Sequence, residues 1–183
     1  VLVNWLATLL VKPQHLPRMC YDRGLPAGLR TLVVIPTLLF NKRNVDELLE
    51  ALEVRFLGNQ DVHVHFGLLT DFPDALTATL DTDEALLGHA RAGIEKLNEK
   101  YRDMFTQGEL HARFFLLHRA RLWNPVARRW MGYERKRGKL QALNAVLRGG
   151  DLHDFALVVG DIQALPSVKY VITLDTDTQL PRD

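Results

Sequence analysis

The stretch TLVVIP, residues 31–36, decides the fold that this sequence predicts. It is a continuous run of β-branched and apolar residues stopped by Pro36, which is typical of a strand buried on both faces of a sheet. From Asn44 onward, apolar residues recur at helical spacing instead, and Asn44 is the expected N-cap ahead of Asp46 and Glu47. We therefore expect a buried strand followed directly by a helix.

The alternation of strand and helix continues along the chain. Further strands are expected over residues 62–71, 112–118, 155–161 and 169–175, and further helices over residues 83–101 and 139–147. Strands joined by helical crossovers indicate an α/β fold, a three-layer sandwich with a mainly parallel sheet. Residues 12–30 contain three prolines and no periodic pattern, so they are expected to form a connector.

The composition is that of a globular protein with its own core. The chain has 183 residues, of which 47% are apolar and 25% charged. Its one cysteine, Cys20, cannot form an internal disulfide, which indicates a reducing compartment. No signal peptide is recognisable at the N-terminus.

The first eleven residues, VLVNWLATLLV, are almost entirely apolar. A helix that crosses a bilayer needs roughly 20 such residues, so this segment is too short to do so by itself. Two interpretations stay open on composition alone. The segment is either a buried amphipathic element or the last turns of a transmembrane helix whose beginning lies upstream.

Positive charge is concentrated between Arg119 and Lys139. This segment holds eight basic residues and one acid, giving +7 where the whole chain is only +1. Such a concentration suggests a polyanionic partner, with phosphate as the obvious candidate. The basic residues are Arg119, Arg121, Arg128, Arg129, Arg135, Lys136, Arg137 and Lys139.

Polar residues follow several of the predicted strands. Thr37 follows the first, Asp71 ends the second, and Asp175 and Asp177 follow the last. In open α/β sheets ligands bind beyond the carboxyl ends of the strands, so these residues are expected to gather there. Acids at i and i+2 share one side of an extended chain and could bind a hard cation such as Mg²⁺ or Mn²⁺. The alternative is that Asp175 and Asp177 only cap the next turn.

Three known patterns can be compared with these residues. A phosphatase of the haloacid dehalogenase type has Asp-x-Asp-x-Thr/Val after a strand, but here the fifth position is Gln179 and few residues follow. A P-loop fails, because five residues instead of four separate Gly132 from Gly138 and Leu140 replaces the Ser or Thr. A nucleotide-sugar glycosyltransferase, whose Asp-x-Asp pair carries a metal, remains.

The sequence resembles one such family, the glycosyltransferase region of bacterial cyclic β-1,2-glucan synthases. The resemblance runs over essentially the whole chain and keeps the same order of motifs. The stretches that carry it are LVNWLATLLVKPQHLPRM, RTLVVIPTLL, VDELLEALEVRFLGNQD, HFGLLTDFPDA, WNP with RRWMGYERKRGKLQALNAVLRG, and YVITLDTDTQLPRD.

The resemblance implies an incomplete GT-A fold, with residues 31–183 as its N-terminal, donor-binding half. It also implies UDP-glucose as donor, a growing β-1,2-glucan as acceptor and Mg²⁺ or Mn²⁺ as cofactor. The full protein would be a bacterial inner-membrane enzyme with this segment on the cytoplasmic side. Residues 1–30 would then be the end of a truncated transmembrane segment plus a connector.

The resemblance assigns roles to eight donor-binding residues. The acidic pair would bind the metal and the diphosphate, two residues after the first strand would line the nucleoside, and one acid would bond the base or ribose. A Gly-Lys…Asn element would lie beside the donor. From its own chemistry the lysine could equally be a solvated surface residue. The residues, in that order, are Asp175 and Asp177; Pro36 and Thr37; Asp71; and Gly138, Lys139 and Asn144.

A mechanism follows from the resemblance. Turning an α-linked donor into a β-1,2 linkage requires inversion by in-line attack of a sugar 2-hydroxyl, with the metal stabilising the departing UDP. The base that accepts the hydroxyl proton would lie after the acidic pair, and residues 178–183 cannot contain it. We therefore expect no catalytic residue in this chain and no turnover by it alone.

Other residues are open to competing interpretations. His63 and His65 share a strand face, but no third metal ligand is near them in sequence. Trp123, Trp130 and Tyr133 could stack on bases, pack on the sheet, or form a platform for the acceptor sugar. A basic nucleic-acid-binding module and a scaffold for other domains are the alternatives to a transferase, and no nucleic acid is expected as a partner of the transferase.

Overall fold

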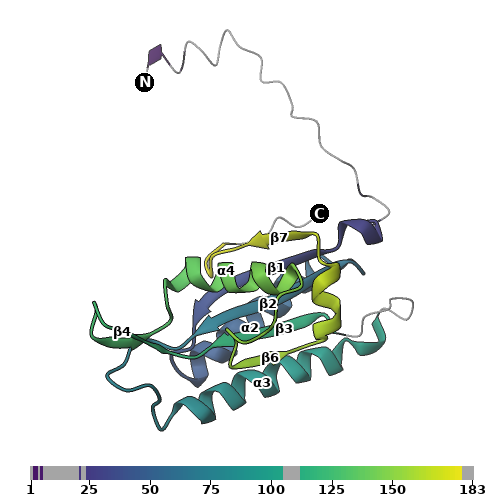
Figure 1. Ribbon diagram of the computed structural model, residues 1–183. Coiled ribbons are helices and arrows are strands. Elements are labelled where there is room, and N and C mark those ends of the chain that lie inside the picture. Colours follow the sequence, from purple (N-terminus) through teal and green to yellow (C-terminus); the bar gives the residue numbers. More distant parts are fainter. Residues whose placement is uncertain (1, 4, 6–20, 22–23, 105–111, 179–183) are drawn as a thin grey trace.

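The computed structural model describes residues 2–3, 5, 21, 24–104 and 112–178. Seven strands and three long helices follow one another within these residues (Figure 1). The elements are β1 (Thr31–Leu38), α2 (Lys42–Leu57), β2 (Val64–Asp71), α3 (Asp83–Lys100), β3 (Phe114–Arg119), β4 (Leu122–Asn124), β5 (Arg129–Met131), α4 (Arg135–Leu147), β6 (Leu157–Val159) and β7 (Tyr170–Thr173). Short 3₁₀ turns cover Ala27–Leu29, Arg102–Met104 and Ile162–Ser167.

Five strands form the central sheet in the order β6-β3-β2-β1-β7. The strands β1, β2, β3 and β7 are parallel, and β6 pairs antiparallel with β3. The fold is therefore α/β with a mostly parallel mixed sheet, which confirms the predicted class, and β6 is an antiparallel edge strand. The small hairpin of β4 and β5 extends beyond the carboxyl ends of the parallel strands (Figure 1).

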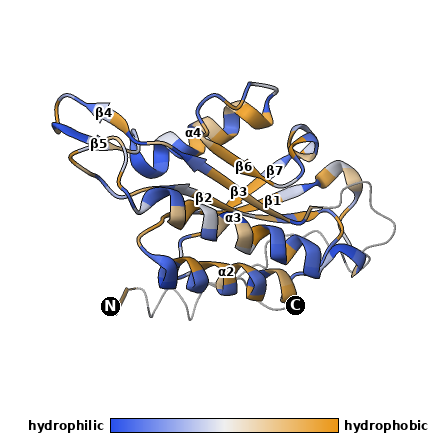
Figure 2. Ribbon diagram, turned by 90° about the horizontal axis from the view of Figure 1, so that it is seen from below, coloured by the Kyte–Doolittle hydropathy of each residue, from blue (hydrophilic) through white to orange (hydrophobic). Residues whose placement is uncertain are grey.

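Helices lie on both faces of the sheet, an arrangement compatible with the predicted three layers. One apolar cluster joins the sheet to α2 and α3, and a second joins its other face to α4 and the 3₁₀ turn at Ile162–Ser167. Figure 2 shows hydrophobic strands between helices whose outer faces are hydrophilic. Residues 31–35 of β1 and all of β3 are buried between the two helical layers, which explains why their apolar runs show no alternation.

The sequence predicted that Pro36 stops the first strand, and this prediction is wrong. The strand continues to Leu38, and Pro36 sits in register with Leu69 of β2. The carbonyl of Val34, two residues earlier, accepts a hydrogen bond from the backbone N–H of Leu174. Residues two apart direct their backbone polar groups to the same neighbouring strand, so the backbone nitrogen of Pro36 also faces β7. The paired part of β7 ends at Thr173, so no ladder bond is required from the missing N–H of Pro36.

Two helices begin earlier than predicted. The N-cap of α2 is Asn41, whose side chain accepts a hydrogen bond from the backbone N–H of Asn44 at 2.9 Å, while the Asn44 side chain accepts one from Phe40 at 3.2 Å. The predicted cap, Asn44, is thus the return partner of the true cap, as in a capping box. Helix α4 begins at Arg135, one turn before the predicted Lys139.

The prediction for the N-terminal segment falls almost wholly outside the described residues. Within residues 1–11 the structure describes only Leu2, Val3 and Trp5, whose side chains are exposed. Among all the residues described, no helix combines the length and the apolar character that a membrane span requires.

Candidate functional site

The order of the strands points to a ligand crevice between β1 and β7. From β1 the chain builds β2 and β3 outward on one side, with α2 and α3 as crossovers, and then returns to add β7 on the other side of β1. Ligands of open α/β sheets bind at such a reversal, beyond the carboxyl ends of the two strands. The residues that follow β1 and β7 therefore lie where a ligand is expected to bind.

The acidic pair follows β7 in a turn and not in an extended chain. The backbone N–H of Thr178 donates to the carbonyl of Asp175 at 3.0 Å, which closes the turn. The prediction of an extended segment at this point is wrong, because the last ladder bond to β1 is made by Leu174. Both Asp175 and Asp177 are exposed, and 63% of the Asp175 side chain is accessible.

A lysine of α4 contacts the first of these acids. The ammonium of Lys136, in the first turn of α4, forms an ion pair and hydrogen bond with a carboxylate oxygen of Asp175. The two side chains are each at least half exposed, so the pair is open to competition by other ions. Sequence analysis had counted Lys136 only among the general positive charges of its segment. Its position beside the acids is a product of the fold.

The chemistry of the acidic pair fits a hard divalent cation. Within the described residues, no three His, Cys, Asp or Glu side chains come together as a metal-binding group. Two exposed carboxylates are nevertheless the donor set that Mg²⁺ or Mn²⁺ takes when waters and substrate phosphates complete its octahedron. Any metal site at Asp175 and Asp177 would therefore depend on the substrate for further ligands.

A buried ionic cluster lies below the carboxyl ends of β1, β2 and β3. Both carboxylate oxygens of Asp71 accept from Arg119, at 2.9 and 3.0 Å, and Lys139 lies 3.1 Å from the second oxygen. The same ammonium donates to the carbonyl oxygen of Thr37 at 2.6 Å. The fold thus brings together Thr37, Asp71 and Lys139, three of the eight predicted donor residues.

The cluster is closed to solvent. Asp71 is 1% and Lys139 3% exposed, so the interpretation of Lys139 as a solvated surface lysine is wrong. Burial lowers the pKa of Lys139, an effect that the adjacent Asp71 carboxylate opposes. In this arrangement neither side chain is free to touch a nucleotide. They link β1, β2 and α4 at the carboxyl ends of the strands instead.

Two glycines allow this close packing. A Cβ on Gly132 would lie 2.4 Å from an oxygen of Asp71, and one on Gly138 would lie 2.1 Å from the carbonyl oxygen of Tyr133. Gly138 therefore serves the packing of α4 against the preceding loop. That loop also contains Glu134 in the left-handed region, with φ of 51°, where a residue with a side chain is uncommon.

One member of the site was missed by sequence analysis. His118, at the penultimate position of β3, is buried next to the ionic cluster and hydrogen-bonds the Thr70 hydroxyl at 2.9 Å. Burial lowers the pKa of His118 to about 4, so the imidazole is neutral near pH 7. The only sequence signal for it was its position directly before Arg119 at the end of a buried strand.

The other predicted donor residues are placed differently. Pro36 and Thr37 are half-buried at the end of β1, on the side of the strand order reversal. Asn144 is exposed in the second half of α4, and the structure does not bring it to the ionic cluster. Of the predicted Gly-Lys…Asn element, only the Gly-Lys part reaches the strand ends.

The basic segment is largely neutralised by acids, all but Glu134 from elsewhere in the chain. Six of its eight cations form ion pairs, and three of these pairs, at Arg119, Arg121 and Lys139, are buried. The segment is therefore not a continuous cationic surface of the kind that attracts nucleic acid. The pairs are Arg119–Asp71, Arg121–Asp83, Arg135–Asp74, Lys136–Asp175, Arg137–Glu134 and Lys139–Asp71.

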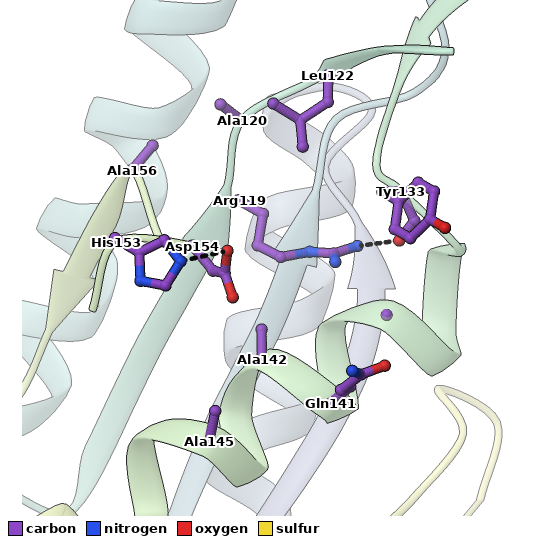
Figure 3. A pocket seen from close by; sticks show the side chains of 11 residues that line it. Arg119, Ala120, Leu122, Tyr133, Gln141, Ala142, Ala145, His153, Asp154 and Ala156 are labelled. Atoms are coloured by element: carbon purple, nitrogen blue, oxygen red, sulfur yellow. Dashed lines mark hydrogen bonds and ion pairs between the residues drawn. The ribbon is translucent and has the colours of Figure 1, made fainter. Parts of the chain in front are cut away.

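A pocket of about 520 Å³ opens beside α4, on the face away from α2 and α3 (Figure 3). Its floor is formed by alanines of α4 and of the segments beside β3, and its rim carries Tyr133, Gln141, His153 and Asp154. His153 and Asp154 are paired at 3.2 Å. Sequence analysis gave no sign of this pocket, because its walls come from segments far apart in the chain.

The chain resembles a known protein over its whole length. No protein-family model matches it. It is 41% identical, over 182 residues, to the cyclic beta-(1,2)-glucan synthase NdvB of Rhizobium meliloti (strain 1021). This confirms the resemblance that the sequence motifs had indicated. The alignment covers all of this chain and 6% of that synthase, so the chain is similar from end to end to one short segment of a cyclic beta-(1,2)-glucan synthase.

Proposed function

We propose that the chain is the donor-binding half of a metal-dependent, inverting glucosyltransferase that uses UDP-glucose to make cyclic β-1,2-glucan. The observation that carries the proposal is the meeting of Asp175 and Lys136 at the reversal point between β1 and β7, in a chain 41% identical to a segment of a glucan synthase. The fold would be the first half of a GT-A domain, formed by residues 31–183.

The residues at the crevice have distinct tasks in this proposal. Asp175 and Asp177 would hold Mg²⁺ or Mn²⁺, which would neutralise the diphosphate and stabilise the charge that develops on the departing UDP. Lys136 would leave Asp175 when the metal arrives and meet the diphosphate as a point charge. Pro36 and Thr37, at the end of β1, would line the nucleoside.

The buried residues would act beneath the donor. Asp71 and Lys139 fix the Thr37 carbonyl and the start of α4, so they would set the shape of the crevice without touching the nucleotide. No side chain of this chain is proposed as the base that accepts the acceptor's 2-hydroxyl proton. That group and most of the glucan site would lie in the rest of a longer inner-membrane protein, with this segment on the cytoplasmic side.

Calorimetric titration with UDP, with and without Mn²⁺, tests the proposal. We expect saturable heat only in the presence of the metal, and loss of that heat in Asp177→Asn. The matched control is Asp46→Asn, which changes an exposed acid of α2 and should bind as the unchanged chain does. Folded protein that gives no metal-dependent heat would overturn the assignment. Salt-sensitive binding to oligonucleotides in its place would support the nucleic-acid alternative.

A further inference from the structure

The turn that carries the acidic pair is held from below by an arginine of α2. Arg55 lies in the last turn of that helix and is 9% exposed. Its Nη2 donates to the carbonyl oxygen of Thr176 at 2.9 Å and to that of Thr178 at 2.7 Å. Its Nη1 donates to Ala51, one turn earlier in the same helix, at 3.0 Å.

The burial of this guanidinium is not explained by pairing with an acid. Among the described residues, no carboxylate lies within ion-pair distance of Arg55, and its Nε is buried without a hydrogen-bond partner. Burial lowers the pKa of Arg55. A buried charge is costly unless hydrogen bonds compensate for it, and the compensation here comes from three backbone carbonyls, two of them in the turn.

The two turn carbonyls lie on either side of Asp177. The carbonyl of Thr176 is part of the peptide bond that precedes Asp177, and the carbonyl of Thr178 lies one residue after Asp177. Fixing both restricts the backbone torsions that aim the Asp177 side chain. Both carbonyls face inward to Arg55, while Asp175 and Asp177 are exposed.

We propose that Arg55 is the positioning residue of the acidic turn and holds Asp175 and Asp177 in the orientation in which they bind a metal–diphosphate. The inference rests on the proposed function for the identity of the ligand. It assigns to α2, on the far side of the sheet from α4, a role in the donor site. The planar guanidinium suits this task, because Nη1 is held by the carbonyl of Ala51 while Nη2 donates to both turn carbonyls, and the rigid plane fixes these directions relative to one another.

Backbone hydrogen exchange gives a test that needs no ligand. The Thr178 amide is protected by its bond to Asp175, so Arg55→Met should accelerate its exchange by roughly tenfold or more, and Arg55→Lys should restore the protection only in part. Amides of β1 serve as the internal reference. The matched control is Arg43→Met, because Arg43 is an exposed arginine of the same helix and pairs only with Glu47 within the described residues.

Calorimetry with UDP and Mn²⁺ supplies the functional readout. Both Arg55 variants should weaken metal-dependent UDP binding, roughly tenfold for Met and less for Lys, and the Arg43 variant should not. An unchanged Thr178 exchange rate in Arg55→Met would overturn the proposal, and so would unchanged UDP affinity. If the unchanged chain shows no metal-dependent UDP binding, the proposed function fails, and hydrogen exchange alone then decides whether Arg55 holds the turn.

Discussion

Replacing Asp71 with asparagine distinguishes a structural acid from a nucleotide ligand. The carboxylate of Asp71 is the shared partner of two buried cations, Arg119 and Lys139. Asparagine keeps the size of the side chain and removes its charge, so the two cations remain buried with their main counter-ion gone. Were Asp71 an open ligand for a base or ribose, the same change would affect binding and leave stability nearly unaltered.

The magnitude follows from burial. Arg119 is bound to Asp71 through two hydrogen bonds, and the side chains of Asp71 and Lys139 are 2% and 3% exposed, so solvent cannot replace the lost charge. Removing one partner of a buried ion pair lowers the free energy of unfolding by about 3–5 kcal/mol. For a chain of this length that corresponds to a fall in melting temperature of roughly 10 °C. Urea unfolding, followed by circular dichroism at 222 nm, measures the free energy directly.

The control is Asp74→Asn, which removes an acid three residues further on. Asp74 pairs with Arg135, whose side chain is 61% exposed, so its loss should cost about 1 kcal/mol or less. Adding Lys139→Met to Asp71→Asn should recover part of the stability, because one unpaired cation is removed. The reasoning is refuted if Asp71→Asn unfolds at the same urea concentration as Asp74→Asn.

Three further predictions use stability and metal binding. Gly138→Ala should destabilise the fold by about 1–3 kcal/mol in urea, because the new methyl meets a backbone carbonyl, whereas Gly88→Ala, in open space on α3, should stabilise it by up to about 1 kcal/mol. Burial lowers the pKa of His65 to about 4 in the folded chain. The neutral imidazole therefore contributes its full share to the free energy of unfolding above pH 6.5, and this contribution is lost as the pH falls toward 4. His65→Gln should therefore flatten the acid side of the stability–pH curve by about 3 kcal/mol, and an unchanged slope would contradict this. Lys136→Met should tighten Mn²⁺ binding in calorimetry without UDP, because a competing cation leaves the acidic turn, and weaker binding would refute that role.

The fold was predictable where the local pattern and the tertiary contacts agree. The apolar runs at β1, β2 and β3 have no alternative to burial between two layers of helices, so both their type and the fold class could be predicted. Boundaries failed where a neighbouring segment decides them. Whether Pro36 can sit in a strand depends on where the paired part of β7 ends, more than 130 residues away. The antiparallel direction of β6 is likewise set by tertiary packing.

The candidate site was predictable in the identity of its residues and not in their partners. Sequence order places Thr37, Asp71 and Asp175 at strand ends, because parallel strands share a carboxyl edge. It cannot show that Asp71 is enclosed by Arg119 and Lys139, since that depends on how α4 packs. Arg55 was invisible for the same reason, as its partners lie 121 and 123 residues away.

The residues of the candidate site are of two kinds: exposed residues that could bind a ligand, and buried residues that fix the position of the exposed ones. Lys139, the lysine predicted to meet a diphosphate, is buried. Lys136, one turn earlier on α4, contacts the acidic turn instead. The two are linked, because the bond from Lys139 to Thr37 joins the start of α4 to the end of β1 and so fixes where Lys136 can reach. Arg55 fixes the other side by holding the turn itself. An exposed pair of carboxylates at a sheet edge would otherwise sample many orientations, and preorganising them from two helices reduces the entropy lost when a metal and a diphosphate bind.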